Sequence, residues 1–539
     1  MVGSALLLAG CVFTATRLAV DYLPCPYSAG ASAPQPRISD LAAPRLSWQF
    51  LAQGTNKSQS GYRIQVASSP ARLQSGAADV WDSGLVPSSA SLSVAYGGAP
   101  RPPRSQSFWR VQVWDEGGAT CGPSDASAWG VWETPLLLEQ DWGGAQWLTR
   151  DPPPAAPPSD CDLYQPDPAP LFRRDVALDA KPPGVALASA RAYIAGLGYF
   201  ELYINGAALP EAGALDPAFT SYNRTVLYST QNATAAIGGA AAFTVGVVLG
   251  KGWWDPLPLR FWGHLNWRNA LAIGPPLFRL ALYLDFSDGS TQVVTSSAAP
   301  GSGWLVGPSE LLRNNIYLGT VVNRSLEQPL AWQRPGFPAG ATWAPPHAAT
   351  AVPAGALRAA YMPPVRRFPA VPAVQLSSAA SGPLGPGPTR VYDVGKQMSG
   401  TCRWCRGGGG RTAPGAVLRL RYGEVLYANG SLNGLTAVAG QIKRPGAGGP
   451  CAPDTAWQED TYIARGDAGG ECYQPSFVWH AFRYVEATGS GAQSLASLEC
   501  SPMRTDLALT TSFASSSPLL NSIWAMECVA WAKVCTRRL

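Results

Sequence analysis

Charged residues are scarce in this chain of 539 residues, in which Asp, Glu, Lys and Arg together make up 14%. The Lys and Arg residues are scattered along the chain, and the formal net charge is only +5. A protein that binds nucleic acid needs concentrated positive charge to contact phosphates. We therefore expect no nucleic-acid partner.

Histidine is rarer still, with only His264, His347 and His480 in the chain. No Ser-His-Asp, nucleotide-binding or metalloprotease pattern occurs. His480 lies within the strand-like stretch FVWHAFRYV, which predicts a histidine packed in a strand. The sequence thus carries none of these common catalytic patterns.

The apolar run at the N-terminus, Ala5 to Phe13, is too short to span a bilayer, and we expect no membrane partner. We interpret residues 1–14 as a signal segment, although no Lys or Arg precedes the run. Sequons that permit glycosylation in a secretory setting occur at Asn56, Asn223, Asn232, Asn323 and Asn429. The leading expectation is a secreted or extracellular protein.

Cysteine is limited to eleven residues, far below the content of a disulfide scaffold, and the odd number leaves at least one thiol unpaired within the monomer. Cys402 and Cys405, with Cys451 and Cys472, superficially offer four thiolates for zinc. The second pair lacks close spacing, and the nearby glycines indicate a loop. We expect disulfides or free thiols here and no metal site.

Glycine and proline are abundant, with 57 and 50 residues, which is typical of short strands joined by turns. Tyr62, Ile64 and Val66 alternate with polar residues, and Trp109 begins a second alternation followed by the turn signal DEGG. An immunoglobulin-like or fibronectin-like sandwich over residues 15–139 is the natural assembly.

A second β unit is expected over residues 140–360. In it, the alternating stretch GYFELYI ends at Asn205-Gly206, and a later stretch turns at Asp288-Gly289. Both dipeptides favour hairpins because they tolerate positive φ. The proline-rich stretch 151–170 is predicted to be an exposed insertion or linker.

A loose region is expected over residues 363–388, within a third β unit that spans 361–503. After it the pattern becomes helical. Ser517 and Pro518 suit an N-cap and first helical position, and an apolar stripe follows at Leu519, Ile523, Met526, Ala530 and Val534. An apolar stripe of this kind needs a packing partner to cover it. We therefore expect residues 504–539 to be the start of a domain that the sequence interrupts.

Several segments in order resemble alpha-L-rhamnosidases of the bacterial and fungal type. PRLSWQF and FWRVQVWDEGG resemble the family's first sandwich, and GYFELYINGAAL with VGVVLGKGWW resembles its jelly-roll domain. YDVGKQMSG and FVWHAFRYVEATG are similar to its concanavalin-like sandwich, and TSFASSSPLLNSIW resembles the first helix of its six-hairpin helical barrel. The resemblance implies an all-β fold of tandem sandwiches with a short C-terminal helix.

The resemblance also implies inverting hydrolysis of terminal alpha-L-rhamnosides, with one carboxylic acid and one carboxylate in a barrel that this chain lacks. We therefore predict a rhamnose-containing glycan or glycoside as partner and no catalytic residue within the chain. The alternative is a non-catalytic carbohydrate-binding protein built from the same β-domains. Departures from the family's pattern are the proline-rich stretch and the CRWCRGGGGR segment after Thr401.

Four residues are weak candidates for carbohydrate binding: Asn205, Trp253, Trp254 and Trp262. Indole faces suit the apolar side of a pyranose, with Trp267 nearby, although buried sandwich tryptophans are equally common. The Asn205 amide suits a sugar or a calcium ion in the second β unit, although its Asn-Gly turn already explains it. No other cofactor is expected.

Three carboxylates invite a catalytic interpretation, namely Glu424, Glu459 and Asp460. They lie inside strand-like segments. We expect them to have surface or edge roles instead.

Overall fold

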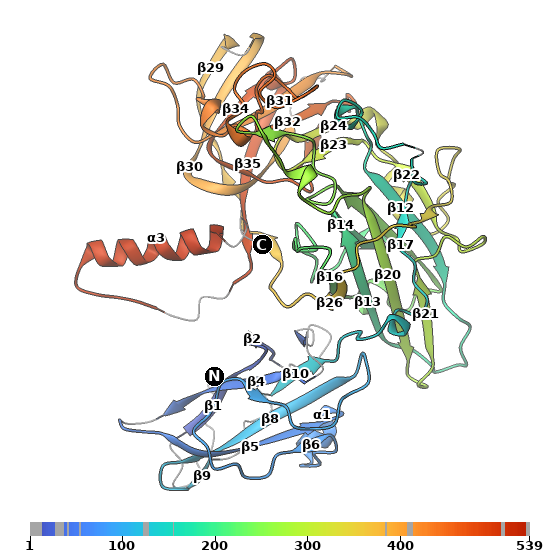
Figure 1. The fold of residues 1–539 in the computed structure, drawn as a ribbon, viewed down its shortest axis with the longest axis vertical. Coiled ribbons are helices and arrows are strands. Elements are labelled where there is room, and N and C mark those ends of the chain that lie inside the picture. The colour runs from blue at the N-terminus through green and yellow to red at the C-terminus, as the bar shows by residue number, and fades with distance from the viewer. Residues whose placement is uncertain are drawn as a thin grey trace. The chain divides into compact units, whose positions relative to one another are not determined.

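The structure is a computed structural model. It describes residues 13–26, 37–39, 43–52, 55–121, 129–154, 156–382, 385–406, 413–507 and 512–534. Strands dominate it, which confirms the predicted all-β class (Figure 1). The chain divides into two compact units, residues 1–144 with 358–362 and residues 145–357 with 363–539. Within the described ranges, no helix has both the length and the apolar character needed to cross a membrane.

The first unit contains two sheets. In order, the first sheet consists of β2 (Leu23–Pro24), β1 (Phe13–Val20), β4 (Arg45–Ala52) and β7 (Val94–Ala95). The second consists of β3 (Arg37–Ile38), β10 (Gly130–Glu133), β8 (Gln106–Asp115), β5 (Gln59–Ala67) and β6 (Trp81–Asp82), with β9 (Thr120–Cys121) beside β8. The helices are α1 (Pro70–Gln74) and the 3-10 turn η2 (Glu139–Trp142).

The alternating residues of this unit form its core, as the sequence predicts. Ile64 and Val66 on β5 are buried together with Trp109 on β8, and they pack against Trp48 and Trp132. The predicted turn after β8 is closed by the Gly118 N–H, which donates to the Asp115 carbonyl at 3.0 Å. The predicted apolar run at the N-terminus lies, apart from Phe13, outside the described residues.

The second unit begins with two facing sheets of a jelly roll. One consists of β25 (His347–Ala348), β11 (Leu148–Thr149), β20 (Leu277–Phe286), β13 (Leu187–Leu197), β16 (Thr225–Asn232) and β26 (Ala356–Ala359), with β21 (Thr291–Thr295) beside β20. The other consists of β15 (Ala207–Ala208), β14 (Tyr199–Ile204), β17 (Ala242–Gly250), β12 (Pro170–Ala177) and β22 (Leu305–Pro308). Apolar residues of both sheets form one core.

An eleven-stranded sheet completes the second unit (Figure 1). Its main path is β23 (Leu311–Asn315), β24 (Gly319–Asn323), β32 (Glu459–Ile463), β31 (Val417–Gly423), β34 (His480–Thr488), β30 (Gly385–Arg406), β35 (Leu495–Thr505) and β27 (Val365–Arg367). β28 (Val371–Pro372) pairs with β35, while β29 (Val374–Gly382) and β33 (Glu471–Tyr473) pair with β30. Trp404, Tyr422 and Tyr462 are buried in its core.

Shorter elements connect these sheets. They are a ribbon of β18 (Arg260–Phe261) and β19 (Leu265–Asn266), helix α2 (Thr234–Ile237), and the 3-10 turns η3 (Asp162–Tyr164), η4 (Trp267–Asn269), η5 (Arg324–Leu326), η6 (Leu330–Gln333), η7 (Gly434–Thr436), η8 (Ala439–Gln441) and η9 (Ala492–Ser494). The predicted turns at Asn205-Gly206 and Asp288-Gly289 join β14 to β15 and β20 to β21.

One of two predictions of loose structure is wrong. The proline-rich stretch 151–170 is largely exposed, as predicted, and a disulfide from Cys161 to Cys451 ties it to a distant loop. The region 363–388 contains β27, β28, β29 and the start of β30, because its residues pair with β35 and with the following strand. β35, which is distant in sequence, orders β27 and β28, whereas β29 forms a hairpin with β30, which follows it directly.

The clustered cysteines form disulfides, so their sulfur atoms are not free to bind zinc. Cys402 bonds Cys500, and Cys405 bonds Cys472. This confirms the prediction of disulfides or free thiols, and Cys402 and Cys405 both lie on β30, which is paired on both sides. The glycines 407–410 lie outside the described residues.

The last described element is the predicted helix α3 (Pro518–Val534). Ser517 caps it, with its Oγ accepting the Leu520 N–H at 3.4 Å. Four of its large apolar side chains are exposed, including Leu519 at 68% and Met526 at 63%, while Trp524 is half-buried and stacks on Phe513. The side chains of Ala530 and Val534 are outside the described set.

Candidate functional site

A cavity of about 400 Å³ in the second unit is walled by aromatic rings. Its aromatic lining residues are Tyr199, Phe219, Trp253, Phe261, Trp262, Trp267, Tyr317 and Trp479. The other lining residues are aliphatic side chains, a glycine and Gln458, so no charged side chain faces this space. We call it the aromatic cavity.

The rings of the aromatic cavity hold one another in place. Trp253 lies 5.6 Å from Phe219 and 5.6 Å from Tyr317, measured between ring centroids. Tyr317 in turn meets the edge of Phe261 at 4.7 Å, and Phe261 meets Trp262 at 6.0 Å. Edge-to-face pairs of this kind contribute roughly 0.5–1.5 kcal/mol each beyond the area they bury. The wall is therefore preorganised.

Trp262 stands at the cavity with 61% of its surface exposed and its backbone in the left-handed region, at φ 50°. The backbone N–H of Trp262 donates to the Gly440 carbonyl at 3.2 Å. A Cβ on Gly440 would lie 1.7 Å from the Phe261 ring, so only glycine permits this close approach. An apolar ring held exposed by a constrained backbone is a feature of ligand sites.

One polar atom in the wall lacks a partner. The Tyr317 hydroxyl is buried and makes no hydrogen bond to any described residue. Burial raises the pKa of Tyr317 above its ordinary value, so the phenol stays neutral and keeps its proton to donate. A ligand hydroxyl would satisfy it.

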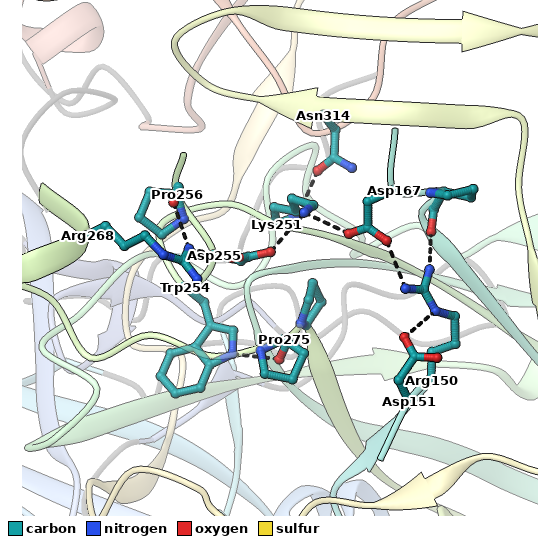
Figure 2. A network of polar contacts seen from close by, with 12 residues as sticks. Arg150, Asp151, Asp167, Lys251, Trp254, Asp255, Pro256, Arg268, Pro275 and Asn314 are labelled. Atoms are coloured by element: carbon teal, nitrogen blue, oxygen red, sulfur yellow. Dashed lines mark hydrogen bonds and ion pairs between the residues drawn. The ribbon is translucent and has the colours of Figure 1, made fainter. Parts of the chain in front are cut away.

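The segment Lys251–Asp255 carries Trp253 into the cavity wall, and an ion-pair network fixes it (Figure 2). Lys251 Nζ lies 2.7 Å from Asp167 and 2.9 Å from Asp255. Arg268 pairs with Asp255 at 2.6 Å, and Arg150 pairs with Asp167 at 2.8 Å. Burial alone would lower the pKa of Lys251, but the two carboxylates raise it above its ordinary value.

Trp254 points away from this cavity although it is adjacent to Trp253. Its ring is 4% exposed, and its Nε1–H donates to the Pro275 carbonyl at 2.7 Å (Figure 2). Tyr222 packs edge-on against it at 5.4 Å. Because its surface and its donor are both used internally, Trp254 serves the fold.

The structure therefore brings Trp253, Trp262 and the neighbouring Trp267 together and leaves Trp254 and Asn205 elsewhere. The Asn205 Oδ1 accepts the Thr244 N–H at 2.9 Å, and its Nδ2 donates to the Ala236 carbonyl at 3.2 Å. These bonds agree with the turn that the sequence already offers as the explanation of Asn205, and its role as a ligand of a sugar or calcium stays a prediction. Across the described ranges, no three His, Cys, Asp or Glu side chains gather as a metal site.

Sequence reasoning missed five aromatic residues of the wall, which are Tyr199, Phe219, Phe261, Tyr317 and Trp479. Each comes from a different segment, and single aromatic residues carry no local signal. Only the density of tryptophan between residues 253 and 267 pointed to this site.

The prediction of a surface or edge role is wrong for Asp460. Asp460 is 4% exposed. Its carboxylate accepts hydrogen bonds from the Thr320 N–H at 2.9 Å and from the Tyr422 hydroxyl at 2.7 Å. His480 Nε2 lies 3.0 Å from the same carboxylate. Burial alone would raise the pKa of Asp460, but these partners, His480 first, hold it below its ordinary value. His480 is fully buried on β34, as predicted.

The other two carboxylates that invited a catalytic interpretation also have side-chain partners. Glu459 pairs with Arg421 at 2.6 Å, and Glu424 accepts a hydrogen bond from Gln397 at 3.0 Å. Both are half-buried. The three carboxylates thus have internal partners, and none lines the aromatic cavity.

Three domain families match the chain in order. Residues 30–138 match the Rha78A-like N-terminal immunoglobulin domain, residues 185–369 the alpha-L-rhamnosidase N-terminal domain, and residues 385–503 the bacterial alpha-L-rhamnosidase concanavalin-like domain. The chain belongs to the alpha-L-rhamnosidase family. The predicted family and its sandwich domains are thereby confirmed.

Known alpha-L-rhamnosidases match almost the whole chain. One from Formosa agariphila is 27% identical over 509 residues, covering 90% of this chain and 48% of the relative, and one from Streptomyces avermitilis is 24% identical, covering 90% and 58%. The solved alpha-L-rhamnosidase from Dictyoglumus thermophilum has a TM-score of 0.76 at 25% identity, covering 97% of this chain and 52% of that one. The chain spans about half the length of these relatives.

Proposed function

We propose that this chain forms a carbohydrate-binding, non-catalytic part of an alpha-L-rhamnosidase and that the aromatic cavity holds the sugar. The observation that carries this proposal is an uncharged cavity with four tryptophans in a member of that family. The full protein would hydrolyse terminal alpha-L-rhamnosides, and its partner would be a rhamnose-containing glycan or glycoside.

The chemistry of the cavity suits a neutral sugar with an apolar face. A pyranose presents C–H groups on one side, and a deoxyhexose adds a methyl group, so both gain by packing on indole rings. The cavity volume of about 400 Å³ is near the lower end of ligand pockets, which span about 300–1,000 Å³. One or two rings would fit, with the Tyr317 hydroxyl bonding a sugar hydroxyl.

Hydrolysis by the aromatic cavity itself is not expected. An inverting glycosidase needs two carboxyl groups about 6.5–9.5 Å apart on either side of the scissile bond. The cavity wall carries none, and Glu424, Glu459 and Asp460 are engaged elsewhere. We therefore expect the chain to bind rhamnosides without cleaving them.

The test combines binding and hydrolysis. Tryptophan fluorescence during titration with L-rhamnose and an aryl alpha-L-rhamnoside measures binding, and release of the aryl group measures cleavage. We expect saturable binding, no cleavage by this chain, and cleavage by a longer protein that includes any downstream coding sequence. Cleavage by the chain alone would overturn the non-catalytic role.

A matched pair of variants locates the binding. Trp262→Ala should weaken rhamnoside binding at least tenfold, because it removes an exposed wall of the cavity. Tyr427→Ala removes an aromatic ring that is 45% exposed outside the cavity and should change nothing. If the longer protein binds rhamnosides but never cleaves them, the alternative of a pure carbohydrate-binding protein is correct.

A further inference from the structure

A second cavity of about 310 Å³ in the same unit has the opposite chemistry. Polar side chains prominent in its wall are Glu201, Tyr203, Asp216, Gln231, Arg366 and Arg367. We call it the polar cavity. None of these side chains takes part in the aromatic cavity.

The two cavities flank the same three segments. Tyr199, Leu215 and Val365 line the aromatic cavity, while the residues that follow each of them, Phe200, Asp216 and Arg366, line the polar cavity. Backbone hydrogen bonds tie the segments together, from the Phe200 N–H to the Asp216 carbonyl at 2.8 Å and from the Ala214 N–H to the Val365 carbonyl at 2.7 Å. Adjacent residues thus face two chemically different spaces.

Gln231 is the feature of the polar cavity that the fold does not explain. It lies on β16 with 1% of its surface exposed. Neither its Oε1 nor its Nε2 makes a hydrogen bond to any residue that the structure describes. Burying an amide without partners opposes folding, and in native proteins an ordered water, an ion or a ligand commonly meets such a group. Gln231 is among the residues that line the polar cavity.

Arg367 offers a second unused group in the same wall. Its Nε is buried without a hydrogen bond to the described residues, while its Nη2 donates to the Pro475 carbonyl at 3.1 Å. Arg366, in contrast, is engaged by Asp506 at 3.1 Å and by the Pro210 carbonyl at 3.0 Å. The free donors therefore come from Gln231 and Arg367.

Acceptors and negative charge complete the wall. One carboxylate oxygen of Asp216 accepts the Gly213 N–H at 2.7 Å, and a Glu201 oxygen accepts the Tyr203 hydroxyl at 2.7 Å. Burial raises the pKa of Asp216 to about 6, so at neutral pH its carboxyl is largely ionised. The two carboxyl groups share this wall with the guanidinium groups of Arg366 and Arg367, so the charges of the lining balance, and neutral hydroxyl groups can both donate to it and accept from it.

We propose that the polar cavity is a second carbohydrate site, which binds a neutral, hydroxyl-rich hexopyranose through Gln231 and Arg367. The Gln231 amide bonds one hydroxyl through Nε2 and its neighbour through Oε1, and the Arg367 Nε donates to a third. Only the choice of a sugar as ligand rests on the proposed function, because the site shares no side chain with the aromatic cavity.

Calorimetric titration and thermal unfolding of the full chain test this site. The probes are the methyl glycosides of D-glucose, D-galactose and D-mannose, with methyl alpha-L-rhamnoside for comparison. We expect at least one hexoside to bind the unmodified chain. Gln231→Leu should weaken its binding at least tenfold and yet raise the melting temperature without sugar, because an unpaired buried amide is replaced by an apolar group of similar size.

Two further variants keep the outcome clear. Arg367→Lys retains the charge but loses Nε, and should weaken the same hexoside several-fold. Trp262→Ala lies in the other cavity and should leave hexoside affinity within twofold. A lower melting temperature and unchanged binding in Gln231→Leu would assign the amide to the fold and overturn the proposal.

The absence of any hexoside binding to the unmodified chain would also overturn it, as would loss of hexoside binding in Trp262→Ala. The proposed function fails separately, if methyl alpha-L-rhamnoside does not bind while a hexoside does.

Discussion

The ion-pair network and the aromatic cavity share the segment Lys251–Asp255 but differ in how their groups are satisfied. In the network, the basic groups of Arg150, Lys251 and Arg268 meet carboxylates, and the carboxylates each meet a base. In the cavity, a ring is exposed and a hydroxyl is unpaired. Fully paired groups hold the fold, and unpaired ones are available to a ligand.

The largest effect that tests this comparison should come from two tryptophans, Trp254 within the segment Lys251–Asp255 and Trp262 beyond it. Trp254→Ala should cost roughly 3–5 kcal/mol of unfolding free energy, because it empties a buried site. Trp262→Ala should cost no more than about 1.5 kcal/mol, since its ring is exposed and it makes one edge-to-face contact, with Phe261. Urea unfolding of both variants measures the contrast. Equal losses would show that Trp262 also serves the fold.

A smaller effect is expected when the network loses its central cation. Lys251→Met should cost about 2 kcal/mol, below the 3–5 kcal/mol of an isolated buried pair, because Asp167 and Asp255 keep other arginine partners. It should also weaken rhamnoside binding, since the network fixes the segment that carries Trp253. Unfolding and fluorescence titration measure both, with the exposed Lys396→Met as control. Unchanged binding would separate the network from the cavity.

The smallest expected effect concerns a buried carboxyl group that belongs neither to the ion-pair network nor to the aromatic cavity. Glu486 is fully buried, and both its oxygens lack hydrogen bonds to described residues. Burial raises its pKa from 4.5 to about 6. The folded state thus binds this proton more tightly than the unfolded chain, so the contribution is favourable below pH 4.5 and is lost as the pH rises through about 6.

Glu486→Gln should remove this pH dependence and stabilise the protein at pH 7 by up to about 2 kcal/mol, the free energy of a shift of this size. Chemical unfolding at a series of pH values between 4 and 7 measures it. Glu424→Gln controls for the loss of one negative charge. A destabilised Glu486→Gln at pH 7 would indicate that an unseen partner satisfies the carboxylate.

Local patterns predicted the strands and turns well, because alternation and Asn-Gly chemistry act within a few residues. They could not separate Trp253 from Trp254, since only the packing of Tyr222 and Phe219 decides which ring is buried. They also misjudged Asp460, whose partners Thr320, Tyr422 and His480 lie on three other strands or strand ends. Long-range contacts set the site, and one sequence does not show them.

The disulfide between Cys161 and Cys451 spans 290 residues of the chain. A single proteolytic cut anywhere between these cysteines therefore yields two fragments that remain one covalent molecule. Such a nicked protein would migrate at full mass on a non-reducing gel and separate into two bands only after the bond is reduced.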